Sequence, residues 1–351
     1  MTAATIAKPR ALVSHHIDGW LVGWFAVVVW LALWVAERSG ATAAQLDGPI
    51  YWLAIVASAM HFGISYHLAY SDSRGLVRRR PVALLVVPAA LAVGLATIVA
   101  VSLVAGTEST GRLTGILVTS VYVLTMWHYI KQAYGVARLG AAYAHISLTV
   151  GEVRILRYGI YPLWLMNVAR LLARGYSISF SGYRVGAEVL APMMYTVVRC
   201  VAIGCAVPVA VVFVRVARRR AGWPPALMVA PYAAAFLWLG APLGYASIGL
   251  LLATFHALQY LPCAHRAEVA MAAPGASDVN ATRWLELFGG AACGGLLLTT
   301  WAPGMMNRLL IGDGKPLLFS AAFFVFLNLH HYLIDAVIWR TRGELVRAMM
   351  A

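Results

Sequence analysis

The chain has 351 residues, of which 62% are hydrophobic and only 11% are charged. Soluble globular domains carry about 25% charged residues, so this composition excludes an ordinary soluble protein. The formal net charge is +14. Because the basic residues lie between apolar runs, this charge indicates membrane topology and argues against nucleic-acid binding.

Apolar runs long enough to cross the hydrocarbon core of a bilayer recur along the whole sequence. They predict about ten transmembrane helices, near residues 19–37, 50–70, 82–105, 113–136, 155–173, 187–214, 223–240, 243–262, 284–302 and 316–339. The predicted fold class is therefore an all-α, polytopic transmembrane helical bundle. It is expected to form one integral membrane domain, with an N-terminal segment 1–18, a bundle over 19–340 and a tail 341–351.

The arginine and lysine residues orient this bundle, because cytoplasmic loops of membrane proteins carry an excess of both. With the helices placed as above, the poorer side receives only Arg38, Arg112, Arg170, Arg174, Arg184, Arg308 and Lys315. The richer side is predicted to be cytoplasmic, so both termini are expected there. We expect a multi-pass protein of a bacterial inner membrane, in which every even-numbered helix runs from outside to inside.

Histidines are the most informative residues of the sequence, since ionisable groups inside a bilayer are costly. A layer of them falls in the second, fourth, eighth and tenth predicted helices: His61, His128, His256, His330 and His331. Each precedes the cytoplasmic end of its predicted helix by about 6 to 10 residues, or about 9 to 15 Å. Nearer that surface lie His67 and the pair His15 and His16.

Convergent neutral imidazoles are typical ligands of transition metals. The sequence therefore predicts a metal site assembled from several helices, with candidate ligands His15, His16, His61, His67, His128, His256, His330 and His331. Helical geometry limits what each helix supplies, because adjacent histidines diverge by about 100° and residues six apart by about 120°. Each helix is expected to offer one inward ligand, or two.

Polar residues near these histidines are candidates for orienting them or for catalysis. Asp335 follows His331 by four residues on the same helix face, so it is expected to orient His331 or to bind the metal itself. Tyr129 and Tyr260 are expected to supply hydrogen bonds in the site. His145 falls in a predicted loop and is expected to have only a structural role.

The candidate ligands occur in the segments HFGISYH (61–67), WHYIKQ (127–132), FHALQY (255–260) and HHYLID (330–335). On these segments the chain resembles the histidine-rich integral membrane oxidative enzymes, which include the fatty-acyl desaturases and hydroxylases and the carotene-cleaving Brp/Blh family. The resemblance implies non-haem iron near the cytoplasmic face and a lipophilic substrate. The HxxxH and HxxHH boxes of the desaturases are absent, so one or two iron ions and several reactions stay open.

We therefore expect a membrane-embedded, metal-dependent oxidoreductase that hydroxylates, desaturates or cleaves a lipid-soluble molecule. The sequence has no flavin, haem-attachment or iron–sulfur motif, so a separate electron donor is expected. Membrane lipids are the other expected partners, and nucleic acid is not. Three other functions stay open: an electron-transfer protein with b-type haem, a transporter with a histidine proton relay, and a structural subunit of a larger complex.

The distribution of basic residues generates a prediction about topology. Reporter domains inserted after residue 78 and at the C-terminus should report the cytoplasm, and one near residue 108 should report the periplasm. Fusions to a reporter that is active in only one compartment measure this directly. A periplasmic C-terminus would contradict the orientation, because it would move the histidine layer into the outer half of the membrane.

Overall fold

The structure is a computed structural model, and it describes residues 11–40, 43–71, 75–173, 176–177, 184–185, 190–241, 248–272, 281–312, 317–340 and 343–350. The prediction of an all-α fold is confirmed for these residues. The exception is a pair of two-residue antiparallel strands, β1 (Tyr176–Ser177) and β2 (Arg184–Val185). The beginning of the predicted N-terminal segment, residues 1–10, lies outside the described residues.

Helices make up the rest of the described secondary structure, and the short η segments are single π-helical turns that continue their α-helical neighbours. In chain order the helices are α1 (His15–Gly19), η1 (Trp20–Trp24), α2 (Phe25–Arg38), α3 (Ala43–Tyr70), α4 (Leu76–Arg79), η3 (Val82–Val86), α5 (Val87–Ala105), α6 (Thr107–Tyr143), α7 (Val150–Gly159), α8 (Tyr161–Ala173), α9 (Leu190–Arg220), α10 (Ala226–Gly240), α11 (Ile248–Ala272), α12 (Ala281–Trp284), η4 (Leu285–Gly289), α13 (Gly290–Leu296), η5 (Leu297–Trp301), α14 (Ala302–Leu310), α15 (Leu318–Ile338) and α16 (Glu344–Met350).

Within the described residues, seven helices are long and apolar enough to cross a membrane. They are His15–Arg38, Asp47–Tyr70, Val82–Ala105, Thr110–Tyr143, Pro192–Arg220, Thr282–Leu310 and Leu318–Ile338. The chain is therefore a multi-pass membrane protein, but with seven such spans where the sequence predicts about ten. The difference falls on the predicted helices 155–173, 223–240 and 243–262.

Each of these three segments departs from a simple span for a physical reason. The first is broken into α7 and α8 at Ile160, just before Pro162, which has no backbone N–H to donate. The second forms α10, which is apolar but has only 15 residues. The third is described only from Ile248, because residues 243–247 lie outside the described residues. The mean hydropathy of the apolar part of α11 is lowered by polar side chains, which are His256, Gln259 and His265.

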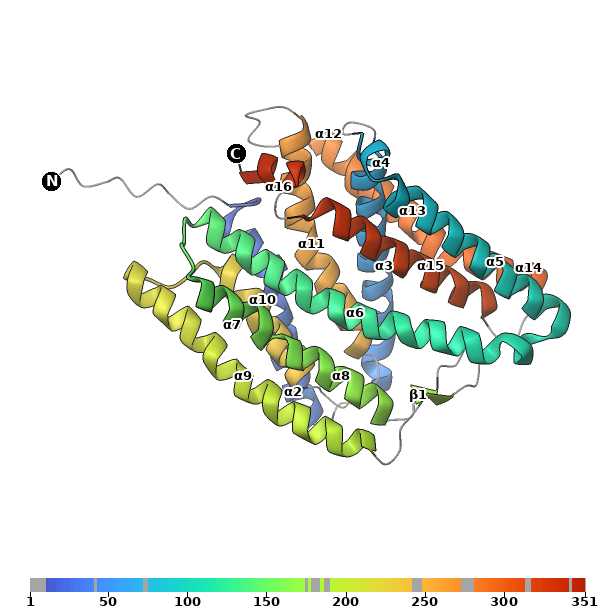
Figure 1. Ribbon diagram of the computed structural model, residues 1–351, viewed down its shortest axis with the longest axis horizontal. Helices are drawn as coiled ribbons and strands as arrows, with labels where there is room; N and C mark the ends of the chain where they lie inside the picture. Colours follow the sequence, from blue (N-terminus) through green and yellow to red (C-terminus); the bar gives the residue numbers. More distant parts are fainter. Residues whose placement is uncertain are drawn as a thin grey trace.

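The helices form a crossed arrangement around the predicted histidine layer. In Figure 1, α6 and α15 run obliquely across the front, while α3 and α11 stand more steeply behind them. The contacts agree with this view: α3 packs against α11 and α15, and α6 packs against α10, α11 and α15. Four helices that are distant in the sequence therefore meet in the middle of the bundle.

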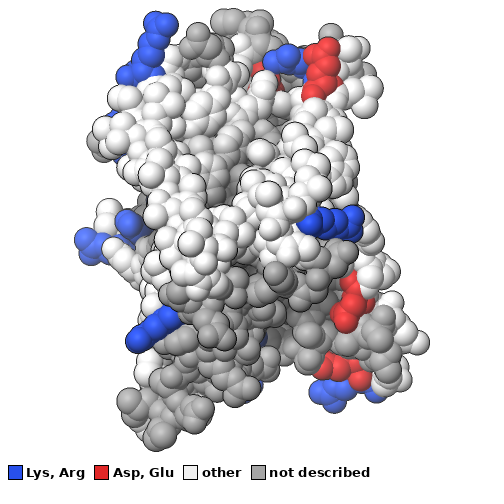
Figure 2. All heavy atoms as spheres, turned by 90° about the vertical axis from the view of Figure 1, so that its right-hand side faces the viewer, with Lys and Arg blue, Asp and Glu red and all other residues white. Residues whose placement is uncertain are grey.

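The outer surface of the bundle is apolar, as contact with lipid requires. On the face drawn in Figure 2, most of the described surface belongs to residues without charge. Large hydrophobic side chains point outward elsewhere, with Trp52, Val93, Leu285 and Leu309 all more than 60% exposed. Soluble monomers rarely expose so much apolar surface.

Small residues let α3 and α13 approach to backbone contact. Gly63 of α3 faces Ala291 of α13, and Ala59 of α3 faces Gly295 of α13. On each helix the two residues are four positions, or about one helical turn, apart. A Cβ atom added at Gly63 would collide with the carbonyl oxygen of Ala291, and one at Gly295 with that of Ala59. Such spacing is typical of closely packed transmembrane helices. The contact fixes the part of α3 that carries His61.

An ion pair between Glu152 of α7 and Arg219, at the C-terminal end of α9, holds these two helices together. The Glu152 carboxylate accepts hydrogen bonds from Arg219 at 3.0 Å and from the backbone N–H of Thr149 at 2.9 Å. Burial by itself disfavours the charged form of Glu152, but these bonds outweigh burial and hold its pKa below the usual value. Glu152 therefore stays ionised while it closes the N-terminal turn of α7.

The contact between α3 and α13 predicts a position-specific cost. Gly295→Ala should destabilise the protein by about 1 to 3 kcal/mol, because the added methyl group overpacks against Ala59. At the adjacent Gly294, an added methyl group meets no atom within 4 Å, so Gly294→Ala is the matched control. Thermal unfolding of both variants in the same detergent measures the difference. Equal midpoints for Gly295→Ala and Gly294→Ala would show that the helices do not pack this closely.

Candidate metal centre

Four histidines from four helices converge in the middle of the bundle. They are His61 on α3, His128 on α6, His256 on α11 and His331 on α15. The nitrogen atoms that they can offer to a metal all lie within 4.8 Å of one another. The Nε2 atom of His331 is 3.0 Å from Nε2 of His61 and 3.2 Å from Nε2 of His128.

The histidine cluster is enclosed by protein. Its most open member is His128, whose side chain is 14% exposed. Two aromatic rings cover the cluster: Tyr260 packs edge-on against His61, and Tyr129 stacks on His256, both with 4.3 Å between ring centroids. These predicted catalytic tyrosines therefore adjoin the histidines through their rings.

Asp335 joins the cluster one helical turn after His331. Its Oδ2 atom lies 3.3 Å from Nε2 of His128 and 3.5 Å from Nε2 of His331. These are the nitrogens that converge, so the carboxylate faces the point where a metal would sit. The other oxygen, Oδ1, accepts hydrogen bonds from the Trp339 indole N–H at 3.2 Å and from the Tyr260 hydroxyl at 3.5 Å. The geometry thus favours Asp335 as a direct ligand over a role behind the imidazoles.

The donor set fits one first-row metal ion. Imidazole nitrogens bind such ions at about 2.0 to 2.1 Å, which separates neighbouring donors by about 3 Å. The Nε2 distances of 3.0 and 3.2 Å match this spacing. Both ring nitrogens of His256 are buried without a hydrogen-bond partner in the described part of the chain. Since buried polar atoms are normally satisfied, a metal at the point of convergence accounts for one of these two nitrogens.

His330, a predicted ligand beside His331, faces the other way. Its Nδ1 atom is 2.8 Å from the Tyr66 hydroxyl, and its Nε2 atom is 2.7 Å from the Tyr70 hydroxyl. Tyr70 donates its proton to the carbonyl oxygen of Leu84 at 2.6 Å, so it accepts from Nε2–H of His330, and Tyr66 donates to Nδ1. His330 therefore links α3, α15 and η3 through hydrogen bonds.

The remaining predicted ligands also lie outside the cluster. The Nε2 atom of His67 contacts Oε1 of Glu268 at 3.0 Å, and Glu268 also pairs with Arg283 at 3.5 Å. His15 and His16 are exposed at the start of α1. The structure thus brings together four of the eight candidate ligands and separates the other four.

The predicted depth of the histidine layer needs a correction on two helices. The helix that carries His128 continues to Tyr143 instead of ending near residue 136, and the one that carries His256 continues to Ala272 instead of near residue 262. Both helices extend beyond the apolar run, because the residues that follow it are rich in good helix formers such as alanine, arginine and leucine or methionine. The spans with His61 and His331 end close to the predicted positions.

Two further residues support the site: Trp339, which was not predicted from the sequence, and Gln132, which the sequence offers as a candidate partner one helical turn after His128. Trp339 holds Asp335 from one turn further along α15, and that spacing of four was a readable signal. Gln132 of α6 donates a 2.8 Å hydrogen bond to the backbone carbonyl of His256. It ties α6 to α11 beside the cluster, and only the packed structure shows this contact.

Comparisons with known proteins give no family for this chain: no protein-family model, no curated protein and no solved structure matches it. The geometry of the histidine cluster is therefore the basis on which a function can be assigned.

The adjacent pair on α15 yields a prediction that separates metal binding from structure. His331→Ala should lose bound metal, because it removes the imidazole at the centre of the cluster. His330→Ala should keep the metal but lose about 1 to 3 kcal/mol of stability, because two hydrogen bonds to tyrosine hydroxyls disappear. Elemental analysis and thermal unfolding of the same preparations measure both effects. Equal metal content in the two variants would contradict the assignment of His331.

Proposed function

We propose that the protein is a membrane-embedded, metal-dependent oxidoreductase that acts on a lipid-soluble substrate. The observation that supports this most strongly is the convergence of four enclosed imidazoles from four helices. An ionisable side chain inside a membrane protein marks a functional site by default. Four together, with a carboxylate directed at the same point, form a donor set for a transition metal.

One ion, and specifically iron, is the metal we propose. Imidazole suits zinc, copper, iron and nickel, and redox chemistry narrows this choice to iron and copper. A carboxylate such as Asp335 favours iron of these two. Two ions would lie about 3.5 to 4 Å apart and need further ligands. Four imidazoles within 4.8 Å and one aspartate supply enough donors for one ion only.

The residues of the chain would bind and position this ion, and the ion itself would supply the redox chemistry when bound. Trp339 and Tyr260 hold one oxygen of Asp335, which leaves the other facing the imidazoles. The rings of Tyr129 and Tyr260 fix the planes of His256 and His61 and exclude water. Such fixed surroundings are what preorganised sites require.

The substrate and the partners follow from where the site lies. The centre is enclosed in a bundle with an apolar exterior, so a lipid-soluble molecule reaches it from the bilayer more readily than a polar one does. His128, the most open ligand, indicates approach along α6. A separate electron donor and a location in a bacterial inner membrane belong to the same proposal.

The geometry argues against two of the three other functions, the b-type haem protein and the transporter with a histidine proton relay. A haem needs a flat slot between two imidazoles, but the rings of His61 and His331 touch edge-on, with centroids 4.5 Å apart. A proton relay needs hydrogen bonds through each member. His256 makes none with its ring nitrogens among the described residues, although it lies within the cluster.

Metal content tests the proposal. Purified protein should carry about one equivalent of iron, or of another first-row metal, without haem absorbance. Alanine at any one of the four ligands should lower the metal content or abolish turnover while the protein stays folded. Asp335→Asn should also lower the metal content, because a neutral amide is a weaker ligand than the carboxylate and no longer compensates the charge of the ion. Elemental analysis with an optical spectrum provides the measurement.

His145→Ala is the control, because His145 is exposed in the loop after α6. It should match the wild-type protein in metal content and activity. If the four ligand variants behaved like His145→Ala, the histidine cluster would have only a structural role and the proposal would be rejected. Wild-type protein that is active but metal-free after gentle purification would reject it as well.

A further inference from the structure

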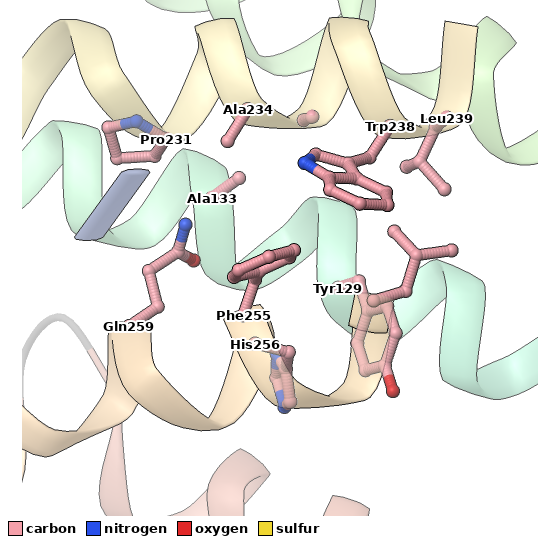
Figure 3. Close-up of a pocket in the computed structure, with 11 residues that line it drawn as sticks. Tyr129, Ala133, Pro231, Ala234, Trp238, Leu239, Phe255, His256 and Gln259 are labelled. Carbon is pink, nitrogen blue, oxygen red and sulfur yellow. The ribbon is translucent and has the colours of Figure 1, made fainter. Parts of the chain in front are cut away.

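A cavity of about 40 Å³ lies beside the metal centre, between α6, α10 and α11. Figure 3 shows Phe255 and Trp238 reaching into it from α11 and α10, with Ala133 and Ala234 at its sides. His256 lines the same cavity, and its ring extends from α11 away from α10. One metal ligand therefore separates this cavity from the point where the four histidines converge.

Most polar groups of the cavity lining have partners or point elsewhere; the exception is His256, whose ring nitrogens have no hydrogen-bond partner among the described residues. The indole N–H of Trp238 donates to the carbonyl of Ala26 at 2.9 Å, and the side chain of Gln259 donates to the carbonyl of Val22 at 2.7 Å. Figure 3 shows the Tyr129 hydroxyl directed away from the enclosed space. Since a buried water needs two to four polar partners, the lining favours an apolar occupant.

The size of the cavity limits that occupant. A single water needs about 10 to 15 Å³ on this kind of measure, whereas a cavity of about 150 Å³ holds benzene. At about 40 Å³, the space is smaller than a cavity that holds benzene, and a molecule of two heavy atoms fits it. Dioxygen is the apolar diatomic molecule that a redox-active metal centre consumes.

His256 provides the link between the cavity and the cluster. Its ring stacks on Tyr129 at 4.3 Å and meets the rings of His61 and His128 edge-on, at 4.8 Å each. We propose that the cavity beside His256 is a binding site for dioxygen that supplies the metal centre. This proposal has two parts. The supply of dioxygen to the metal rests on the proposed function, whereas the binding of a small apolar molecule in the cavity does not.

Xenon is the probe for the binding step, because it enters dry apolar cavities. Xenon NMR of the full-length protein in detergent should show one saturable site. Ala234→Val, which adds two methyl groups to the wall of the cavity, should abolish that site. Ala133→Val, on α6, narrows the same space from the other side and serves as a second variant if the first does not fold.

The supply step is measured by the rate at which the reduced metal centre is reoxidised at a given dioxygen concentration. Filling the cavity should slow this rate by about tenfold, equivalent to about 1.4 kcal/mol, at unchanged metal content. Ala322→Val is the matched control, because Ala322 lines a separate cavity of about 10 Å³ between α5, α6 and α15. It should leave both xenon binding and reoxidation as in the wild-type protein.

Two results would overturn the proposal. One is the absence of saturable xenon binding in the wild-type protein, or xenon binding that persists in both Ala234→Val and Ala133→Val. The other is displacement of xenon with no change in the rate of reoxidation, which would show a cavity that supplies nothing. Metal-free wild-type protein is a different outcome, seen by elemental analysis. It would reject the function proposed above, while the xenon titration would still decide whether the cavity binds a gas.

Discussion

The position of the Nε2 atom of His331 constrains the whole centre. It lies 3.0 Å from His61, 3.2 Å from His128 and 3.5 Å from the Asp335 carboxylate. A ring nitrogen carries either one proton or one lone pair in the plane of the ring, so it satisfies only one of these neighbours by hydrogen bonding. Hydrogen bonds alone therefore leave polar groups unsatisfied in the interior of the bundle, where that is expensive. A cation at the shared point would satisfy all of them together.

Such a point of convergence needs helices that do not slide or rotate, and the packing around the histidines provides this. Gly63 and Gly295 lock α3 against α13 next to His61, and Gln132 ties α6 to the backbone of His256. On α15 the two neighbouring histidines have different tasks. His331 enters the cluster, while His330 fixes the helix by hydrogen bonds to tyrosines on α3. His330 and His331 look equivalent in the sequence, but His331 is a candidate ligand and His330 positions the helix.

The sequence predicts the features that depend on local chemistry. Long apolar runs predict membrane helices, and the cost of buried imidazoles singles out His61, His128, His256 and His331 together with His330. The angle of about 100° between adjacent residues predicts that each helix offers one inward ligand, or two, so it leaves both His330 and His331 as candidates. It does not predict which of them enters the site, because the rotation of α15 is set by packing against α3 and α6. The described residues contain seven helices that are long and apolar enough to span a membrane, so the predicted count of about ten is not confirmed. The cavity is unpredictable, as it arises from side chains of three separate helices.

The nearness of an apolar cavity to a polar cluster follows from the position of His256 between them. A cation is costly in apolar surroundings unless its charge is compensated, and Asp335 is the anionic group that the cluster provides. This compensation lets the rest of the surroundings stay apolar, down to the rings of Tyr129, Phe255 and Trp238. An apolar molecule can then come within one side chain of the metal position without bringing water along. A centre that admits dioxygen must also exclude water. His256 meets this requirement by its position, with the polar donors on one side and the apolar space on the other.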